Sequence, residues 1–339
     1  MTTPGGSSTA ARRPAHNTAR FIELVAPKLE LVELELRENF CSDIATIRKV
    51  GEHILSGRGK RIRPSLLLLS SSMLGYEGSA DIRCGAVVEF IHTASLVHDD
   101  VIDDADIRRG RESINYRWGN HLTVLVGDYL YTHAMKMAIG EGRLEIVDLL
   151  CDTTIMLTEG EILALELKGK TDLTSDQYFE VIGRKTAALF AASCRLPGYL
   201  VDLPSPRADE LWNYGYNLGI CFQLVDDLLD FTSNAETLGK PALADLKEGK
   251  LTLPLILAMP ETTLGERDAI ERIAATRELK TGDAEAIHEI VRRYDCVSRT
   301  MDIAREYAER ALANLSGFPQ STAREALEYA IEYVLDRDR

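Results

Sequence analysis

Two acidic motifs with the same spacing carry the clearest chemical signal in the sequence. They are DDVID at 99–103 and DDLLD at 226–230. In a helix, side chains four positions apart lie one above the other, so each motif presents its first and last carboxylate about one turn apart. Carboxylate oxygens suit hard divalent cations, and Mg²⁺ in particular shares its shell with substrate phosphate oxygens. The spacing therefore predicts two magnesium-binding helix ends.

For either motif alone, a simple alternative stays open, because many acidic runs are only solvated helix ends. The two copies together favour a site, since each follows an apolar stretch, at 87–97 and at 218–225. Like charges gathered on apolar helices destabilise the fold unless a cation neutralises them.

Basic residues gather in short segments that complement the acidic motifs. They are GRGKRIRP at 57–64, RRGR at 108–111, Lys185 with Thr186, and the segment 239–250 with Lys240 and Lys250. Any one of these clusters alone could equally be a solvated loop or an anion-binding site. Arginine and lysine beside magnesium-binding carboxylates together predict a bound diphosphate, which both kinds of group hold.

The overall charge excludes other partners. Lys and Arg number 39 and Asp and Glu 53, so the net charge is −14, the opposite of what nucleic acid or an anionic membrane attracts. The longest apolar run, Leu66 to Leu69 extended by Met73 and Leu74, is far shorter than the roughly 20 residues of a membrane span. The six cysteines show no CxxC spacing, which predicts reduced thiols and a cytoplasmic protein.

Helical periodicity dominates the elements that must position these groups. Apolar residues recur at helical spacing in the stretches 20–40, 84–104, 122–138, 144–167, 177–194, 210–231, 251–258, 284–315 and 323–334. Loops are expected at 56–64, 75–80, 140–143, 169–174, 197–206, 234–249 and 260–265. The sequence shows neither strand patterns nor flexible linkers. We therefore predict one all-α domain without a sheet, spanning residues 18–339, after a disordered tail at 1–17. The tail has no apolar region of a secretory signal.

At these residues the sequence resembles the trans-isoprenyl diphosphate synthases, the polyprenyl synthetase family, and in particular its long-chain members. The resemblance runs from about residue 20 to the C-terminus and rests on six ordered motifs. They are GRGKRIRP at 57–64, EFIHTASLVHDDVIDDADIRRG at 89–110, GDYL at 127–130, GRKTA at 183–187, FQLVDDLLDF at 222–231 and GKPALADLKEGKLTLP at 239–254. It implies a bundle of long antiparallel helices around a deep central cavity, usually as a homodimer.

The resemblance also implies a role for each motif residue. The metal ligands, for about three Mg²⁺ ions, would be Asp99, Asp100, Asp103, Asp226, Asp227 and Asp230. The contacts to the allylic diphosphate would be Arg108, Lys185, Thr186, Gln223, Lys240 and Lys250. The isopentenyl diphosphate site would be Lys60, Arg63, His92 and Arg109, and His92 lies two helical turns before Asp99 on the same face. A core histidine is the alternative for His92.

The family's reaction would be ionisation of the allylic diphosphate, attack by isopentenyl diphosphate and loss of a proton, with Lys185 and the Thr186 carbonyl shielding the cation. In short-chain members an aromatic residue four or five positions before the first aspartate closes the cavity, where this chain has Ser95 and Ala94. We therefore expect a long product, roughly C35 to C50, whose tail passes one turn deeper. Residues that would form a deeper floor, or are simply core, are Phe90, Ile91, Tyr131 and Met135.

Other functions remain as alternatives. A short-chain synthase making geranylgeranyl or farnesyl diphosphate and a partner subunit of a heteromeric synthase are the nearest. A class I terpene cyclase would lack the second aspartate motif, and a purely structural helical protein would need neither motif. One position departs from the family pattern, because Leu243 stands where glycine is usual. If the backbone there needs a positive φ, closure of that loop over the diphosphate would be altered.

Overall fold

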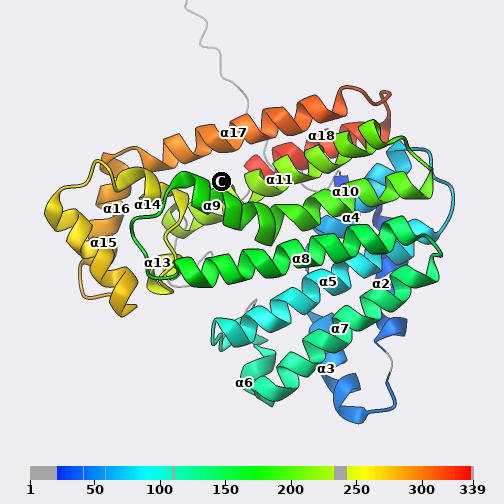
Figure 1. The fold of residues 1–339 in the computed structure, drawn as a ribbon, viewed down its shortest axis with the longest axis horizontal. Coiled ribbons are helices and arrows are strands. Elements are labelled where there is room, and N and C mark those ends of the chain that lie inside the picture. Colours follow the sequence, from blue (N-terminus) through cyan, green and yellow to red (C-terminus); the bar gives the residue numbers. More distant parts are fainter. Residues whose placement is uncertain (1–20, 41, 58, 109–110, 233–242, 337–339) are drawn as a thin grey trace, which may run out of the picture.

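The computed structural model describes residues 21–40, 42–57, 59–108, 111–232 and 243–336 (Figure 1). Nearly all regular structure in them is helical, so the predicted all-α fold is confirmed. The helices are α2 (Ala26–Asn39), α3 (Ala45–Ser56), α4 (Ile62–Met73), α5 (Ala80–Ile102), α6 (Ile114–Trp118), α7 (Asn120–Gly140), α8 (Leu144–Leu167), α9 (Ser175–Ile182), α10 (Ala188–Leu200), α11 (Ser205–Thr232), α13 (Ala244–Lys247), α14 (Leu253–Ala258), α15 (Leu264–Thr276), α16 (Asp283–Arg293), α17 (Cys296–Leu315) and α18 (Thr322–Leu335). The predicted tail at 1–17 lies outside the described residues.

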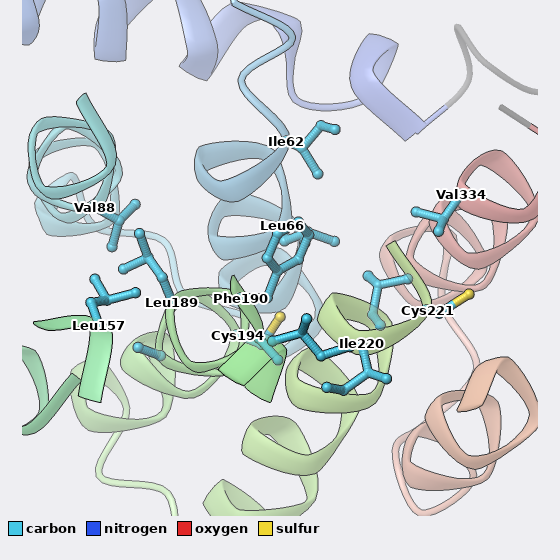
Figure 2. Packing of buried hydrophobic residues seen from close by; sticks show 14 of the residues in the cluster. Ile62, Leu66, Val88, Leu157, Leu189, Phe190, Cys194, Ile220, Cys221 and Val334 are labelled. Atoms are coloured by element: carbon cyan, nitrogen blue, oxygen red, sulfur yellow. The ribbon is translucent and has the colours of Figure 1, made fainter. Parts of the chain in front are cut away.

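Helix α10 occupies the middle of the bundle. It packs against α4, α8 and α11, and its residues Leu189, Phe190 and Cys194 are buried where these helices meet (Figure 2). The outer helices then cover this centre, α17 along α11, and α7 along α5. In Figure 1 the long helices lie side by side across the molecule, and the short helices α13 to α16 gather at one end.

Helix α4 was not predicted from the sequence, because its residues lack the spacing of an amphipathic helix. Its four consecutive leucines, Leu66 to Leu69, are all fully buried, because α5, α10 and α18 surround the helix. Because the helix is buried on nearly every side, with Ser65, Ser70 and Ser71 inside as well, polar and apolar residues do not divide between two faces and give no clear 3.6-residue alternation. The shorter or more polar helices α3, α6 and α15 were also not predicted.

Several predicted boundaries were wrong. The stretch 284–315 is two helices, because Asp295 adopts a left-handed backbone with a φ of 50° between α16 and α17. The loop expected from 197 begins later, since Pro197 sits within the last turn of α10. The loop expected at 234–249 contains the short helix α13.

The stretch 177–194 is a single rod with a change of winding inside it. Helix α9 starts at a capping box, in which Thr174 and Gln177 satisfy each other's backbone N–H groups. The rod continues through a π-helical turn, η1 (Gly183–Ala187), and then into α10. Such turns insert an extra residue into a helix and are frequent at functional sites. Here the turn consists of the GRKTA motif.

The expectation of no sheet fails at one small place. Strands β1 (Ile107–Arg108) and β2 (Arg111–Glu112) pair antiparallel just after the first acidic motif. Two residues per strand are too few to produce an alternating pattern in the sequence.

Within the described ranges, no helix combines the length and the apolar character needed to cross a membrane. The five cysteines in these ranges are free thiols, as the sequence predicted, and four of them are buried: Cys84, Cys194, Cys221 and Cys296.

Candidate active site

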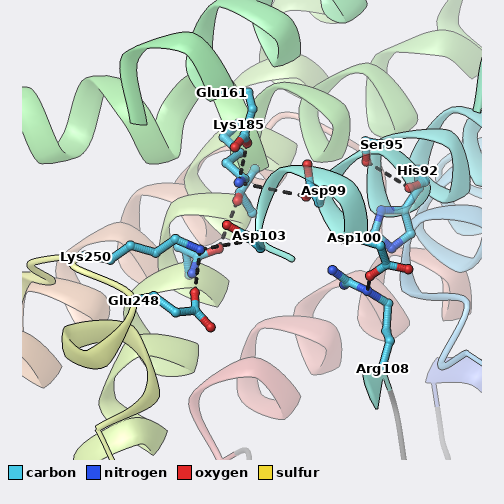
Figure 3. A network of polar contacts seen from close by, with 12 residues as sticks. His92, Ser95, Asp99, Asp100, Asp103, Arg108, Glu161, Lys185, Glu248 and Lys250 are labelled. Atoms are coloured by element: carbon cyan, nitrogen blue, oxygen red, sulfur yellow. Dashed lines mark hydrogen bonds and ion pairs between the residues drawn. The ribbon is translucent and has the colours of Figure 1, made fainter. Parts of the chain in front are cut away.

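The first acidic motif lies at the C-terminal end of α5, and its three aspartates contact different basic side chains (Figure 3). Asp99 faces Lys185, Asp100 pairs with Arg108, and Asp103 accepts a hydrogen bond from Lys250. These cations come from three separate segments, η1, β1 and the loop after α13. The fold therefore brings together the carboxylates and the basic groups that the sequence assigned to one diphosphate site.

Lys185 bridges two carboxylates. Its Nζ lies 3.8 Å from Asp99 Oδ2 and also forms an ion pair with Glu161 of α8. This contact depends on Gly160, because a Cβ there would stand 2.6 Å from the Lys185 backbone nitrogen. Glycine thus lets α8 approach the π-helical turn closely enough for Glu161 to reach the lysine.

Asp103 is held by two lysines. Lys250 Nζ lies 3.2 Å from Oδ2, and Lys168 Nζ lies 3.8 Å from Oδ1. The loops that carry these lysines are joined by a backbone hydrogen bond of 2.8 Å from Gly169 to Gly249. Lys250 also donates to Glu248 at 2.8 Å.

The pKa values of the three aspartates are shifted in different directions by their surroundings. Burial raises the pKa of Asp99 to about 6, although Lys185 opposes this shift. Burial likewise raises the pKa of Asp100, against the effect of Arg108. Burial acts in the same direction on Asp103, but the ammonium groups of Lys250 and Lys185 outweigh it and hold its pKa below the ordinary value. A buried carboxylate such as Asp99 favours any additional cation that reaches it.

The second acidic motif lies near the end of α11, and its three aspartates have different surroundings. Asp226 is exposed, whereas Asp227 and Asp230 are buried. Asp227 accepts hydrogen bonds from Tyr178 Oη at 2.6 Å and from Gln223 Nε2 at 2.7 Å. Burial and the nearby Asp245 carboxylate raise the pKa of Asp227 well above its ordinary value, while the two hydrogen bonds oppose this shift.

Asp230 holds the start of α13. Its Oδ1 accepts from the Ala244 backbone at 2.9 Å and its Oδ2 from the Asp245 backbone at 3.2 Å. The residue before them, Leu243, has a φ of 58° and is fully buried. The positive φ considered from the sequence is therefore present, although the residue is leucine.

The π-helical turn connects the two motifs. Lys185 contacts Asp99 of the first, and the next residue, Thr186, donates from Oγ1 to Gln223 Oε1 at 2.9 Å. Gln223 in turn binds Asp227 of the second. Residues from α5, η1 and α11 thus converge on one place.

Three of the residues expected to bind isopentenyl diphosphate, Lys60, Arg63 and His92, lie within the described ranges. Lys60 is exposed, with Nζ 5.8 Å from the centre of the Tyr333 ring, while the Arg63 guanidinium lies 4.5 Å from the centre of the Phe190 ring. His92 is half-buried on α5, and its backbone carbonyl accepts from Ser95 Oγ at 2.8 Å. Arg109 and Lys240 lie outside the described residues.

The residues expected to set product length divide between faces of α5. At about 100° per residue, Ser95 and Ile91 stay within about 80° of Asp99, whereas Ala94 lies about 140° and Phe90 about 180° away. Phe90 is buried against Phe40, with ring centres 6.3 Å apart. It lines a cavity of about 530 Å³ between α5 and the helices α2 and α3, on the flank of α5 that carries Asp100, and Asp100 and Arg108 also line this cavity. On α7, Tyr131 and Met135 are half-buried.

The donor set fits a hard divalent cation. Asp99, Asp103 and Asp226 offer carboxylate oxygens and keep some exposure. In the part of the chain that the structure describes, no three His, Cys, Asp or Glu side chains stand close enough to hold a metal ion. Lys185 and Lys250 instead contact the first-motif carboxylates, so an incoming metal ion would take over their neutralising role.

Sequence reasoning missed three members of this site. Glu161 of α8 pairs with Lys185, and Lys168, just after α8, pairs with Asp103. Tyr178 contacts the second motif. Glu161 and Lys168 come from a helix whose sequence otherwise shows only amphipathic spacing, and Tyr178 has the spacing of a core residue. Only its contact with Asp227, 49 positions away, distinguishes Tyr178 from such a residue.

Comparison with known proteins agrees with this geometry. The family model described as Polyprenyl synthetase matches residues 44–291. The octaprenyl diphosphate synthase of Escherichia coli (strain K12) is 38% identical over 327 residues, which cover 95% of this chain and 100% of the relative. The heptaprenyl diphosphate synthase component 2 of Geobacillus stearothermophilus is 36% identical, covering 91% and 96%.

A solved structure shows the same fold. The polyprenyl synthase of Caulobacter crescentus CB15, complexed with calcium and isoprenyl diphosphate, superposes with a TM-score of 0.91 at 34% identity, covering 97% of this chain and 100% of that one. The fold is that of the trans-prenyl diphosphate synthases, which are prenyltransferases. The chain belongs to the polyprenyl synthetase family.

Proposed function

We propose that this chain is an all-trans polyprenyl diphosphate synthase that extends an allylic diphosphate with isopentenyl diphosphate, using Mg²⁺, to a product of roughly C35 to C50. The observation that carries this proposal is the π-helical turn, where Lys185 contacts the first acidic motif and Thr186 the Gln223 side chain beside the second. Carboxylates for metal ions and cations for a diphosphate therefore surround the same point from two helices.

Each residue has a distinct task in this proposal. Bound Mg²⁺ would neutralise the diphosphate and so ease its departure. Arg108, Lys185, Lys240 and Lys250 bind the diphosphate oxygens of the allylic substrate and keep them as the C–O bond breaks. Gln223 orients the same group, and the carbonyl of Thr186 faces the allylic cation. Asp226 is the metal ligand of the second motif that solvent and substrate reach most readily, because its side chain is exposed whereas Asp227 and Asp230 are buried.

The bond changes then balance without a nucleophilic side chain. The double bond of isopentenyl diphosphate attacks the allylic cation, forming one C–C bond and leaving a cation on the added unit. Loss of one proton to the released diphosphate restores the double bond, and the chain is five carbons longer. Lys60, Arg63, His92 and Arg109 would hold the second substrate. Burial of the site keeps water from capturing the cation.

The long product is inferred from the small side chains before Asp99 and from relatives that make octaprenyl and heptaprenyl diphosphate. Ser95, on the Asp99 side of α5, leaves room for the growing tail. Ile91 lies one turn deeper on that side, and Tyr131 and Met135 complete the proposed floor. Phe90 faces the other side of α5, so we leave it out of this floor. We also infer a homodimer, a cytoplasmic location, a synthase domain spanning 18–339 and about three Mg²⁺ ions per site.

The experiment is to incubate the purified chain with farnesyl diphosphate, isopentenyl diphosphate and Mg²⁺ and to size the products by chromatography. We expect products in the C35 to C50 range and, in Asp99→Ala or Asp226→Ala, turnover lower by about 10³ with the fold retained. Products that stop at about C20 would favour the short-chain alternative. Activity that appears only with a second protein would favour a heteromeric synthase, as the name of the Geobacillus relative suggests for that protein. Size-exclusion chromatography of the active fraction determines the oligomeric state.

A further inference from the structure

Tyr178 forms one end of a hydrogen-bond chain that ends at the π-helical turn. Tyr178 Oη donates to Asp227 Oδ2 at 2.6 Å, and Gln223 Nε2 donates to Asp227 Oδ1 at 2.7 Å. Thr186 Oγ1 then donates to Gln223 Oε1 at 2.9 Å. Gln223 turns its NH₂ group towards Asp227 and its carbonyl towards Thr186, and each oxygen of Asp227 accepts one hydrogen bond. The hydrogen bonds of the chain therefore converge on Asp227 from both sides.

The chain links two helical rods at two points each. Tyr178 and Thr186 belong to the rod formed by α9 and η1, and Gln223 and Asp227 lie one turn apart on α11. Two contacts between two rods fix both their distance and their register along each other. A π-helical turn is less stable than an α-helical one, so tertiary bonds of this kind are needed to hold it.

The immediate neighbours of the chain are the groups proposed to act on substrate. Lys185 precedes Thr186 in the turn, and Asp226 precedes Asp227 on α11. A slip between the two rods would therefore move the diphosphate-binding ammonium relative to the metal-binding carboxylate. Small displacements of such groups lower turnover strongly, because catalysis depends on groups held in place in advance.

We propose that Tyr178 is a positioning residue, whose hydroxyl fixes Asp227 and through it the placement of Lys185 and Asp226 around the diphosphate. Tyr178 does not itself touch the reacting atoms in this proposal, which rests on the proposed function. It requires that removing one buried hydroxyl weakens diphosphate binding and turnover, beyond any effect on folding stability.

The chain offers a matched control for this test. Tyr214 is also buried, and its Oη donates to the Leu327 carbonyl at 2.8 Å, joining α11 to α18 away from both acidic motifs. Tyr178→Phe and Tyr214→Phe therefore remove the same atom and one buried hydrogen bond each. They differ in whether the acceptor belongs to the site.

The measurements separate binding from turnover. Isothermal titration gives the Kd of inorganic diphosphate with Mg²⁺, steady-state assays give kcat and KM, and urea denaturation gives stability. In Tyr178→Phe we expect a Kd about tenfold higher and a kcat at least about tenfold lower, as loss of a hydrogen bond to a charged group implies. Tyr214→Phe should lose stability to a similar degree and keep Kd and kcat within about twofold.

A second pair of variants tests the other end of the chain and serves if Tyr178→Phe does not fold. Thr186→Ser keeps the hydroxyl that bonds Gln223, and Thr186→Val removes it while keeping the shape. Thr186→Val should bind inorganic diphosphate about tenfold more weakly than Thr186→Ser, because only the serine variant keeps the bond to Gln223. Equal Kd values for these two variants, or for Tyr178→Phe and Tyr214→Phe, would overturn the positioning role. A wild-type chain that elongates no primer would instead count against the proposed function itself.

Discussion

Lys250 Nζ lies 3.2 Å from Asp103 Oδ2, although the two residues are 147 positions apart in the chain. One belongs to the proposed diphosphate contacts and the other to the proposed metal ligands. Together with Lys185 on Asp99 and Arg108 on Asp100, the pair shows that the site cations neutralise the first acidic motif directly. Binding a metal ion and a diphosphate together would exchange partners, carboxylate to metal and ammonium to phosphate, so that every charge stays paired.

Removing Lys250 should uncouple metal binding from diphosphate binding. In Lys250→Met, Asp103 keeps the more distant Lys168 and Lys185, so a metal ion no longer competes with an ammonium group at 3.2 Å. We expect Mn²⁺ to bind about fivefold more tightly in the absence of diphosphate, as titration followed by electron paramagnetic resonance would show. The value of kcat/KM should nevertheless fall by about 10², because one donor to the departing diphosphate is lost.

Lys247→Met provides the control, since Lys247 is an exposed lysine of the same segment. It should change neither metal affinity nor kcat/KM by more than about twofold. Weaker Mn²⁺ binding in Lys250→Met would show that the lysine does not compete with the metal, and the exchange of partners would have to be abandoned.

The raised pKa of Asp99 predicts a pH-dependent effect on stability. With a folded-state pKa of about 6 against an ordinary 3.8, the folded chain binds this proton more tightly than the unfolded chain. The resulting stability is fully present below about pH 4 and is lost as the pH rises through 6. In Asp99→Asn the side chain stays neutral at every pH. Without metal ions, this variant should therefore be more stable than wild type at pH 8, by about 1–3 kcal/mol.

Urea denaturation in a chelating buffer at pH 5 and pH 8 checks this expectation. The advantage of Asp99→Asn should shrink at pH 5, where Asp99 of the wild type is largely protonated. An advantage of equal size at both pH values, or none at pH 8, would mean that the charge on Asp99 is compensated in the metal-free fold. Because the variant also loses a metal ligand, activity is not used for this comparison.

The sequence was sufficient for those parts of the site that have a local signature. The DDxxD spacing placed Asp99 and Asp103 together, and helical periodicity located α5 and α11 to within a few residues. The family pattern has glycine where this chain has Leu243, which left open whether the backbone there needs a positive φ, and the structure shows a φ of 58°.

The missing parts depend on contacts between distant segments. Tyr178 is recognised only by its bond to Asp227, and Lys168 only by its approach to Asp103. The π-helical turn depends on tertiary partners, since no rule of residue spacing distinguishes GRKTA from an ordinary helical turn. The sequence also could not predict that Asp226 and Asp230 have different surroundings, because these depend on burial and on backbone donors from residues 244 and 245.

Product length should respond to bulk on one face of α5. Ser95 lies one turn before Asp99 and is half-buried, so a phenyl group placed there enters the proposed path of the tail. Ser95→Phe should shorten the main product to about C20 or less while turnover stays within about tenfold of wild type. Ala94→Phe should also shorten it, but at a greater loss of stability, because Ala94 is already closely packed. Chromatography of the products from farnesyl and isopentenyl diphosphates gives the measurement.

Thr93→Phe is the matched control on the same helix. Thr93 lies about 160° from Ser95 around α5. It lines the cavity of about 530 Å³, so the ring has space away from the Ser95 face and should leave the product length unchanged. Shortening by Thr93→Phe, or an unchanged product in both Ser95→Phe and Ala94→Phe, would remove the argument that the tail follows the Ser95 face.

Leu243 combines a strained backbone with a fully buried side chain, and the two effects can be separated by substitution. A left-handed conformation costs a leucine about 1–2 kcal/mol, and alanine retains that strain while losing the core contacts. Leu243→Gly loses the same contacts but relieves the strain, so it should be more stable than Leu243→Ala by about 1 kcal/mol in urea denaturation. At Leu246, equally buried but inside α13, the order should reverse, with Ala above Gly by about 1 kcal/mol. If alanine is the better residue at both positions, the positive φ at Leu243 carries no strain, and its burial alone explains why leucine is tolerated beside Asp230.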